Sequence, residues 1–362
     1  MEHPENDDQY KGLKVNKGIA DVPTVNPYIK KRAQRKVYTP SEFVEGILKG
    51  NITILSQAVT LVESSKHEHQ QVAQEIIEKC LPFAGKSVRI GITGVPGAGK
   101  STSFGMHLIN QGRKLAVLAI DPSSERSKGS ILGDKTRMEA LSREKNAFIR
   151  PSPSAGSLGG VARKTRETIV LCEAAGFDTV FVETVGVGQS ETAVHSMVDF
   201  FLLIQLAGTG DELQGIKRGI MEMADGIIIN KADGDNIDKA NLAAAQFRNA
   251  LHLFPPSESG WFPKVLTYSG YYNIGIKEIW DMVGEYMEFT KKNGYFNYKR
   301  NEQAKYWMYE SINDTLRDKF YHNPAVEGML EQTEKQVLNN EISSFVAAKR
   351  MIDLFLDHIA TK

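Results

Sequence analysis

The chain contains little cysteine, since Cys80 and Cys172 are the two cysteines among its 362 residues. Two cysteines cannot build a disulfide framework, and no CxxC pair or cysteine–histidine cluster indicates a structural zinc site. Unpaired thiols are typical of reducing compartments. We therefore expect a cytoplasmic protein without structural zinc.

The sequence also lacks an excess of charge of either sign, because 44 lysines and arginines balance 44 acidic residues. A chain without net charge has no long-range field that attracts nucleic acid or anionic lipid. Its most apolar stretches, residues 200–206 and 227–229, are much shorter than the ~20 residues that span a bilayer. The acidic start, MEHPENDDQY, has the pattern of neither a secretory signal nor a transit peptide. We expect no nucleic-acid partner and no membrane partner.

The hydrophobic pattern divides the chain into four parts. Residues 1–38 are polar and form a predicted tail, and residues 39–85 space their apolar residues as helices do. In residues 86–293 short apolar runs alternate with amphipathic stretches, whereas residues 294–362 have a helical pattern throughout. We expect a tail, an N-terminal helical segment, an α/β domain and a C-terminal helical arm.

The central part predicts an α/β fold of three layers. Strands that are apolar on both faces and joined by helices indicate a mostly parallel sheet covered on both sides. The predicted strands are residues 88–93, 115–120, 177–183, 200–206, 226–230 and 265–269. The predicted helices are residues 100–111, 160–175, 189–198, 212–224, 237–251 and 275–290. Right-handed crossovers then place the functional loops at the carboxyl ends of the strands.

The strongest motif, GVPGAGKS, matches the phosphate-binding P-loop pattern G-x-x-x-x-G-K-[ST]. Its glycines let successive backbone N–H groups face one phosphate chain at the start of a helix. Lys100 can reach the terminal phosphates, and the Ser101 hydroxyl can hold Mg²⁺. The alternative is a glycine-rich turn with a solvated lysine, but it does not account for the apolar strand before the motif. The predicted phosphate-binding residues are Gly94, Gly97, Ala98, Gly99, Lys100, Ser101 and Thr102.

A second motif, NKAD beginning at Asn230, predicts the base. The Asp233 carboxylate can accept from N1–H and the exocyclic amine of guanine, whereas adenine lacks this pair of donors. Asn230 can contact the other edge of the base, and the stem of Lys231 can cover its face. Ser269 and Gly270, at the end of the next predicted strand, can offer backbone N–H groups to the guanine oxygen. A polar turn is the alternative interpretation of the NKAD segment.

A third group of residues is predicted to sense the γ-phosphate. At the end of one predicted strand, the Glu183 carboxylate can organise Mg²⁺ and the Gly186 N–H can donate to the γ-phosphate. Asp121 and Asp134 are candidate residues for Mg²⁺ or the attacking water, with a mobile surface loop as the alternative. The predicted catalytic residues are Lys100, Asp121, Asp134, Glu183 and Gly186, and the predicted metal ligands are Ser101, Asp121, Asp134 and Glu183. The pattern identifies no residue that positions the hydrolytic water.

A further segment, residues 208–217, has glycines on both sides of a charged centre. It can form an additional mobile loop near the nucleotide or an ordinary helix N-terminus capped near Asp211, and the sequence leaves both interpretations open.

The motifs GVPGAGKST, DPSS, GDKTRM, ETVGVGQSE, GTGDELQGIKRGIMEMAD and NKADGD together resemble the MeaB/ArgK family of P-loop GTPases. This family comprises the methylmalonyl-CoA mutase-associated metallochaperones, and the resemblance covers about residues 40–362. It implies a P-loop GTPase domain in residues 86–293 and a GTPase whose low intrinsic rate is stimulated by its partner.

The resemblance also implies a partner and an assembly. The implied partner is an adenosylcobalamin-dependent methylmalonyl-CoA mutase, or a related acyl-CoA mutase, to which the family gates cofactor delivery and which it protects from inactivation. The family forms homodimers to which the helical C-terminal arm contributes, and it takes Mg²⁺ with GTP or GDP. By position, Gln214 and Lys217 match the loop with which the family responds to its partner.

Three other functions fit parts of the pattern. A P-loop kinase that phosphorylates a small molecule or a protein partner would not need the guanine-specific carboxylate of Asp233. A nickel or zinc metallochaperone would need a histidine-rich tract or a cysteine cluster, whereas this chain scatters two cysteines and eight histidines. An interaction protein with a degenerate nucleotide site would not need Lys100, Ser101 and Glu183.

Overall fold

The computed structural model describes residues 38–95, 102–121, 138–153, 158–184, 190–207 and 218–360. The chain divides between Thr39 and Pro40, and the larger unit, Pro40–Lys362, contains all the described helices and strands. The predicted polar tail, residues 1–38, lies outside the described residues apart from Tyr38.

Three helices precede the sheet, as the sequence predicts. They are α1 (Pro40–Leu48), α2 (Ile52–Glu63) and α3 (His67–Cys80), followed by a 3₁₀ turn at Leu81–Phe83. Gly50 ends the first helix in the left-handed backbone region, at φ 71°. The Asn51 side chain caps α2 by accepting from the amides of Thr53 at 3.0 Å and Ile54 at 3.2 Å.

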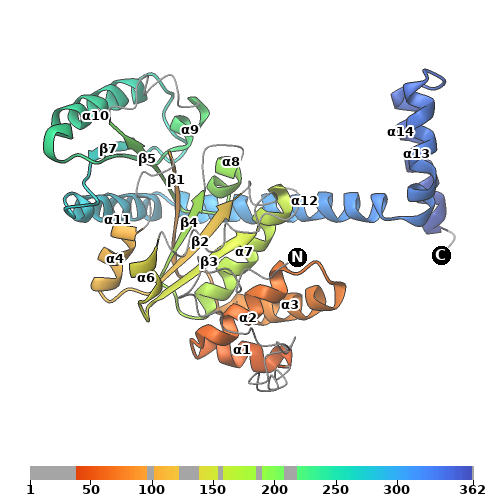
Figure 1. Cartoon of the computed structure of the whole chain (residues 1–362), viewed down its shortest axis with the longest axis horizontal. Helices are drawn as coiled ribbons and strands as arrows, with labels where there is room; N and C mark the ends of the chain where they lie inside the picture. Colours follow the sequence, from red (N-terminus) through yellow and green to blue (C-terminus); the bar gives the residue numbers. More distant parts are fainter. Residues whose placement is uncertain are drawn as a thin grey trace, which may run out of the picture. The chain divides into compact units, whose positions relative to one another are not determined.

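A seven-stranded sheet forms the centre of the molecule (Figure 1). Its strands are β1 (Val88–Gly94), β2 (Leu115–Asp121), β3 (Ala147–Pro153), β4 (Thr179–Thr184), β5 (Phe200–Leu206), β6 (Gly226–Asn230) and β7 (Lys264–Thr267). The order is β3-β2-β4-β1-β5-β6-β7, and every described pairing is parallel. The predicted α/β fold with a parallel sheet is confirmed.

One strand, β3, was not predicted from the sequence. Its sequence, AFIRPSP, contains Pro151 and Pro153, which interrupt the expected apolar run. Proline donates no backbone hydrogen bond and is therefore confined to the edges of sheets. Among the described strands β3 lies at one end of the order and pairs with β2, which is where its prolines are tolerated.

Helices follow the strands at the predicted places, and one short helix, α6, was not predicted. They are α4 (Thr102–Asn110), α6 (Glu139–Ser142), α7 (Leu158–Ala174), α8 (Ser190–His195), α9 (Arg218–Met223), α10 (Ile237–Leu251) and α11 (Ile276–Lys292), with a 3₁₀ turn at Gly234–Asn236. The main core lies between one face of the sheet and α4, α6 and α11, where Phe104, Leu141 and Ile279 are buried against it. On the other face, α7 contacts β2 and β3, and α8 contacts β1 and β4. This arrangement is the predicted three-layer fold.

The C-terminal arm is helical and begins directly after Gly294. It consists of α12 (Tyr295–Tyr321), α13 (Pro324–Leu338) and α14 (Ser344–Ala360). Gly294, at φ 82°, separates α12 from α11. Within the described part of the chain, no helix is long and apolar enough to cross a membrane.

Candidate functional site

The described site residues lie where the parallel strands end. Strands β1, β2, β4 and β6 end at Gly94, Asp121, Thr184 and Asn230. The connection from β1 leads to β2, and the connection from β4 leads past β1 to β5, so the strand order reverses beside β1. In open α/β sheets, such a reversal leaves a crevice for ligands outside the carboxyl ends of the strands.

The strand and the helix that flank the P-loop lie at this crevice. Strand β1 ends at Gly94 and α4 begins at Thr102, which is the strand–loop–helix arrangement that the motif requires. Gly94 has φ 146°, and a Cβ on it would lie 1.9 Å from the Ile204 carbonyl oxygen of β5. No other residue fits there. The predicted residues Gly97, Ala98, Gly99, Lys100 and Ser101 lie outside the described residues.

Asn230 organises the loop that follows β6. Its side chain is 4% exposed, and its Oδ1 accepts from the amides of Lys231 at 2.6 Å and Gly270 at 3.1 Å. Lys231 adopts the left-handed conformation, with φ 60°. The structure therefore brings Asn230, Lys231 and Gly270 together, although they come from two separate loops.

Asp233 and Ser269 join the same two loops a second time. The Ser269 hydroxyl donates a short hydrogen bond to Asp233 Oδ2. The Ala232 amide donates to the Tyr268 carbonyl at 3.0 Å, and the Tyr268 amide donates to the Ile229 carbonyl at 2.9 Å. We call Asn230, Lys231, Asp233, Ser269 and Gly270 the purine corner. Its hydrogen bonds hold one carboxylate beside the end of the sheet.

The backbone amides of Ser269 and Gly270, which were predicted to bind the guanine oxygen, have partners within the protein. The Ser269 amide donates to the Ile274 carbonyl at 2.9 Å, and the Gly270 amide donates to Asn230. Both N–H groups are thus engaged within the protein in this structure. Their predicted contact with the guanine oxygen stays a prediction, and it requires the Gly270 amide to exchange Asn230 for the base.

Tyr268, which was not predicted from the sequence, links the purine corner to α4. Tyr268 is 2% exposed, and burial raises the pKa of its hydroxyl. A Cβ on Gly270 would lie 2.8 Å from this hydroxyl and 3.0 Å from Ser103 Oγ of α4. Only glycine leaves room where the corner meets the helix. The only signal in the sequence was one aromatic residue before the Ser-Gly pair. Hydrophobic periodicity does not distinguish such a residue from an ordinary core residue.

Acidic and hydroxyl side chains gather at the ends of β1 and β4. Glu183 is 9% exposed and pairs in register with Ile92 of β1. Beside it, the hydroxyls of Thr93 and Thr184 lie 2.9 Å apart, and both residues are fully buried. These two threonines were not predicted. Carboxylate and hydroxyl oxygens are the ligands that Mg²⁺ prefers.

The remaining predicted switch residues are placed only in part. Asp121 is the last residue of β2 and follows Ile120, which pairs in register with Thr184. Asp134 and Gly186 lie outside the described residues, as do Gln214 and Lys217. Within the described ranges no three His, Cys, Asp or Glu side chains cluster as a metal site.

Comparisons with known proteins agree with this geometry. The family model "Methylmalonyl Co-A mutase-associated GTPase MeaB" matches residues 55–325. The chain is 45% identical to the GTPase ArgK of Escherichia coli over 308 residues, which cover 84% of this chain and 93% of ArgK. It is 44% identical to the mitochondrial methylmalonic aciduria type A homolog of Mus musculus over 323 residues, covering 86% of this chain and 78% of the relative.

A solved structure, described as a LAO/AO transport system kinase, superposes with a TM-score of 0.70 at 37% identity. It covers 90% of this chain, and this chain covers 100% of it. The family match over residues 55–325 includes all seven described strands and the purine corner, so the similarity is not confined to a P-loop. The chain belongs to the MeaB family of methylmalonyl Co-A mutase-associated GTPases.

Proposed function

We propose that this protein binds GTP and GDP with Mg²⁺ at the carboxyl ends of the strands and hydrolyses GTP slowly on its own. The observation that carries the proposal is the purine corner. Its two loops are fixed by Asn230 Oδ1 and by the Ser269–Asp233 hydrogen bond. A carboxylate fixed in this way accepts two hydrogen bonds from guanine and would face no donor pair on adenine.

The chemistry of such a site is positioning and charge neutralisation. Lys100 and the P-loop amides would hold the phosphates, and Ser101, with Asp121, Asp134 and Glu183, would hold or orient the ion. The bound Mg²⁺ neutralises charge that develops on the phosphate oxygens. Glu183 stands beside the end of β1, and the Thr93–Thr184 hydrogen bond fixes the strand ends there. Gly186 would donate its N–H to the γ-phosphate and lose that contact on hydrolysis.

The proposed partner is an adenosylcobalamin-dependent methylmalonyl-CoA mutase or a related acyl-CoA mutase. Family membership supports a mutase-associated role, and the mouse relative carries a methylmalonic aciduria name. In this proposal the GTPase acts as a chaperone: it gates adenosylcobalamin delivery to the mutase, protects the mutase from inactivation, and hydrolyses GTP faster when the mutase is bound. We also propose a cytoplasmic location.

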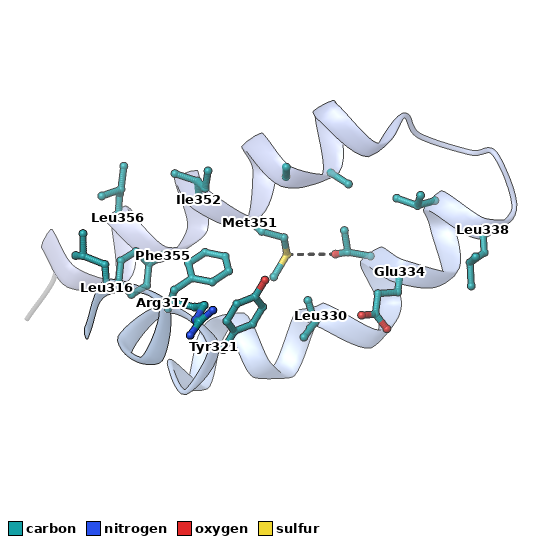
Figure 2. A pocket seen from close by; sticks show the side chains of 15 residues that line it. Leu316, Arg317, Tyr321, Leu330, Glu334, Leu338, Met351, Ile352, Phe355 and Leu356 are labelled. Carbon is teal, nitrogen blue, oxygen red and sulfur yellow. Dashed lines mark hydrogen bonds between the residues drawn. The ribbon is translucent and has the colours of Figure 1, made fainter. Parts of the chain in front are cut away.

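The C-terminal arm supports the proposal of a homodimer. A groove of about 900 Å³ lies between α13, α14 and the end of α12. Figure 2 shows the side chains that line it. Its lining is mostly apolar and includes Leu330, Met351 and Phe355. Leu338 at its rim is 80% exposed, and Ile352 is 50% exposed. An apolar surface of this extent marks an interaction site on a protein that is otherwise water-soluble, and a second copy of the arm would cover it.

Calorimetry with GTP, GDP, ATP and ADP in the presence of Mg²⁺ tests the function. We expect heat for the guanine nucleotides alone, and we expect Asp233→Asn to favour xanthine nucleotides, because the amide can donate to the xanthine carbonyl. Equal affinity for adenine nucleotides would contradict the proposal.

Phosphate release distinguishes the two candidate activities. A GTPase releases phosphate from GTP without an acceptor and does so faster when the mutase is added. The alternative, a kinase that phosphorylates a small molecule or a protein partner, would release little inorganic phosphate at any time. Once that acceptor is supplied, it would form GDP and the phosphorylated acceptor instead.

A further inference from the structure

Helix α8 connects the nucleotide side of the sheet to the strand that follows. It begins at Ser190, six residues after the end of β4, and its inner residues Ser190, Glu191 and Val194 are buried. A Cβ on Gly91 of β1 would lie 2.9 Å from Val194 Cγ1 and 2.9 Å from Val198 Cγ2. The helix and the turn behind it therefore pack directly on the strand that leads into the P-loop.

The end of α8 is held by the C-terminal arm. A helix leaves its last carbonyl groups without partners inside the helix. Here Gln303 Nε2 donates to the Val198 carbonyl at 2.8 Å and to the His195 carbonyl at 3.4 Å. Trp307 Nε1 donates to the Ser196 carbonyl at 3.0 Å. Both donors belong to α12, and each is 6% exposed.

The next residue of the turn is also held by α12. Arg300 binds the Asp199 carboxylate with two hydrogen bonds, of 2.8 Å from Nε to Oδ1 and 2.7 Å from Nη2 to Oδ2. Lys299 Nζ donates to the Asp199 carbonyl at 2.8 Å. Asp199 directly precedes β5. Ser196, Val198 and Asp199, which connect α8 to β5, thus all accept hydrogen bonds from side chains of one helix.

The same helix continues to the hairpin of α13 and α14. Helix α12 has 27 residues, which at 1.5 Å per residue corresponds to about 40 Å. Arg166 of α7 adds support where the helix leaves the sheet, since its Nη1 donates to the Gln303 carbonyl at 3.1 Å. A movement of the α8 turn would therefore be passed to a single stiff element that runs to the hairpin of α13 and α14 (Figure 1).

We propose that Gln303 and Trp307 are positioning residues that couple the nucleotide site to the C-terminal arm through α8. This inference rests on the proposed guanine-nucleotide function. When the nucleotide changes, the α8 turn changes with it, and the hydrogen bonds of Gln303 and Trp307 transmit that change along α12. By thermodynamic linkage, whatever binds α13 and α14 in turn changes the preference for GTP over GDP.

Hydrogen exchange of the full-length wild-type protein is the first test. Calorimetry first establishes that GDP and a non-hydrolysable GTP analogue bind; if neither binds, the proposed function fails. With binding shown, exchange of GDP for the analogue should change the amide protection of α12 and of the α13–α14 hairpin. Identical protection of these helices in the two complexes would overturn the coupling, and this result needs no variant.

Variants then assign the coupling to the two side chains. Trp307→Phe keeps an aromatic ring but removes the indole donor, and Gln303→Met removes the amide. Each should abolish the nucleotide-dependent difference in the arm and change the ratio of GTP-analogue to GDP affinity by about fivefold or more. A general loss of stability would lower both affinities together and leave the ratio unchanged.

Tyr309→Phe is the matched control, because Tyr309 is an aromatic residue of the same helix that is 60% exposed. It should keep the wild-type ratio and the wild-type exchange difference. If Trp307→Phe and Gln303→Met behave like this control, the coupling does not run through these hydrogen bonds and the assignment is wrong.

Discussion

Replacing Asn230 by alanine should uncouple the two loops of the purine corner. The substitution removes the single oxygen that accepts from the Lys231 amide at 2.6 Å and the Gly270 amide at 3.1 Å. A buried donor without a partner costs about 1–3 kcal/mol, so the two donors together cost about 2–6 kcal/mol. Because the corner lies at the end of the sheet and water can reach part of it, we take the lower limit.

A cost of about 2 kcal/mol corresponds to a roughly 30-fold loss of GDP affinity if the loops must be reordered when the nucleotide binds. Calorimetric titration of GDP in the presence of Mg²⁺ measures this loss. Asn236→Ala is the matched control, because Asn236 donates to the Lys231 carbonyl at 2.8 Å from an exposed position of the same loop. Water replaces that bond, and the affinity should change by no more than about twofold. If Asn230→Ala binds GDP as tightly as Asn236→Ala does, Asn230 does not organise the corner.

Two further predictions concern stability and assembly. Burial opposes ionisation of Glu173, but hydrogen bonds from Arg89, Ser87 and the Gly85 amide lower its pKa below the ordinary 4.5. The ionised carboxylate therefore stabilises the fold above about pH 4.5, and this stabilisation is lost on further acidification. Arg89→Met should therefore lower the free energy of unfolding by about 3–5 kcal/mol at pH 7. In urea titrations, the difference in unfolding free energy between the variant and the wild type should shrink below pH 4.5. A difference that stays constant with pH would contradict this pairing. Leu338→Asp should convert the proposed homodimer to a monomer in sedimentation experiments. The control Leu242→Asp, at a position on α10 that is 63% exposed, should leave the dimer intact. A monomeric wild type, or a Leu338→Asp variant that is still dimeric, would refute an interface at this groove.

The sequence predicted those parts of the fold that depend on local spacing. The P-loop and NKAD motifs placed Gly94 and Asn230 at strand ends because both follow apolar runs, and the structure confirms those positions. Strand β3 was missed because Pro151 breaks the apolar pattern, although an edge position tolerates it.

The long-range hydrogen bonds could not be predicted from spacing. Arg89 binds Glu173 across 84 residues, and Trp307 donates to Ser196 across 111 residues. Each of these side chains has an ordinary place in the local pattern, and only the packing of one element on another brings the partners together. Tyr268 was overlooked for the same reason, since a core aromatic and a residue that supports a binding loop look alike in sequence.

The prolines of β3 also affect how molecules of this protein can associate. In a parallel strand, residues alternate in pointing their backbone groups to one side or the other, and a proline is accommodated where its nitrogen points away from the neighbour. Pro151 and Pro153 stand two positions apart, so two amide donors are missing from the outer side of β3. A strand from another chain would find few donors there, which protects this side of the sheet against strand addition and aggregation.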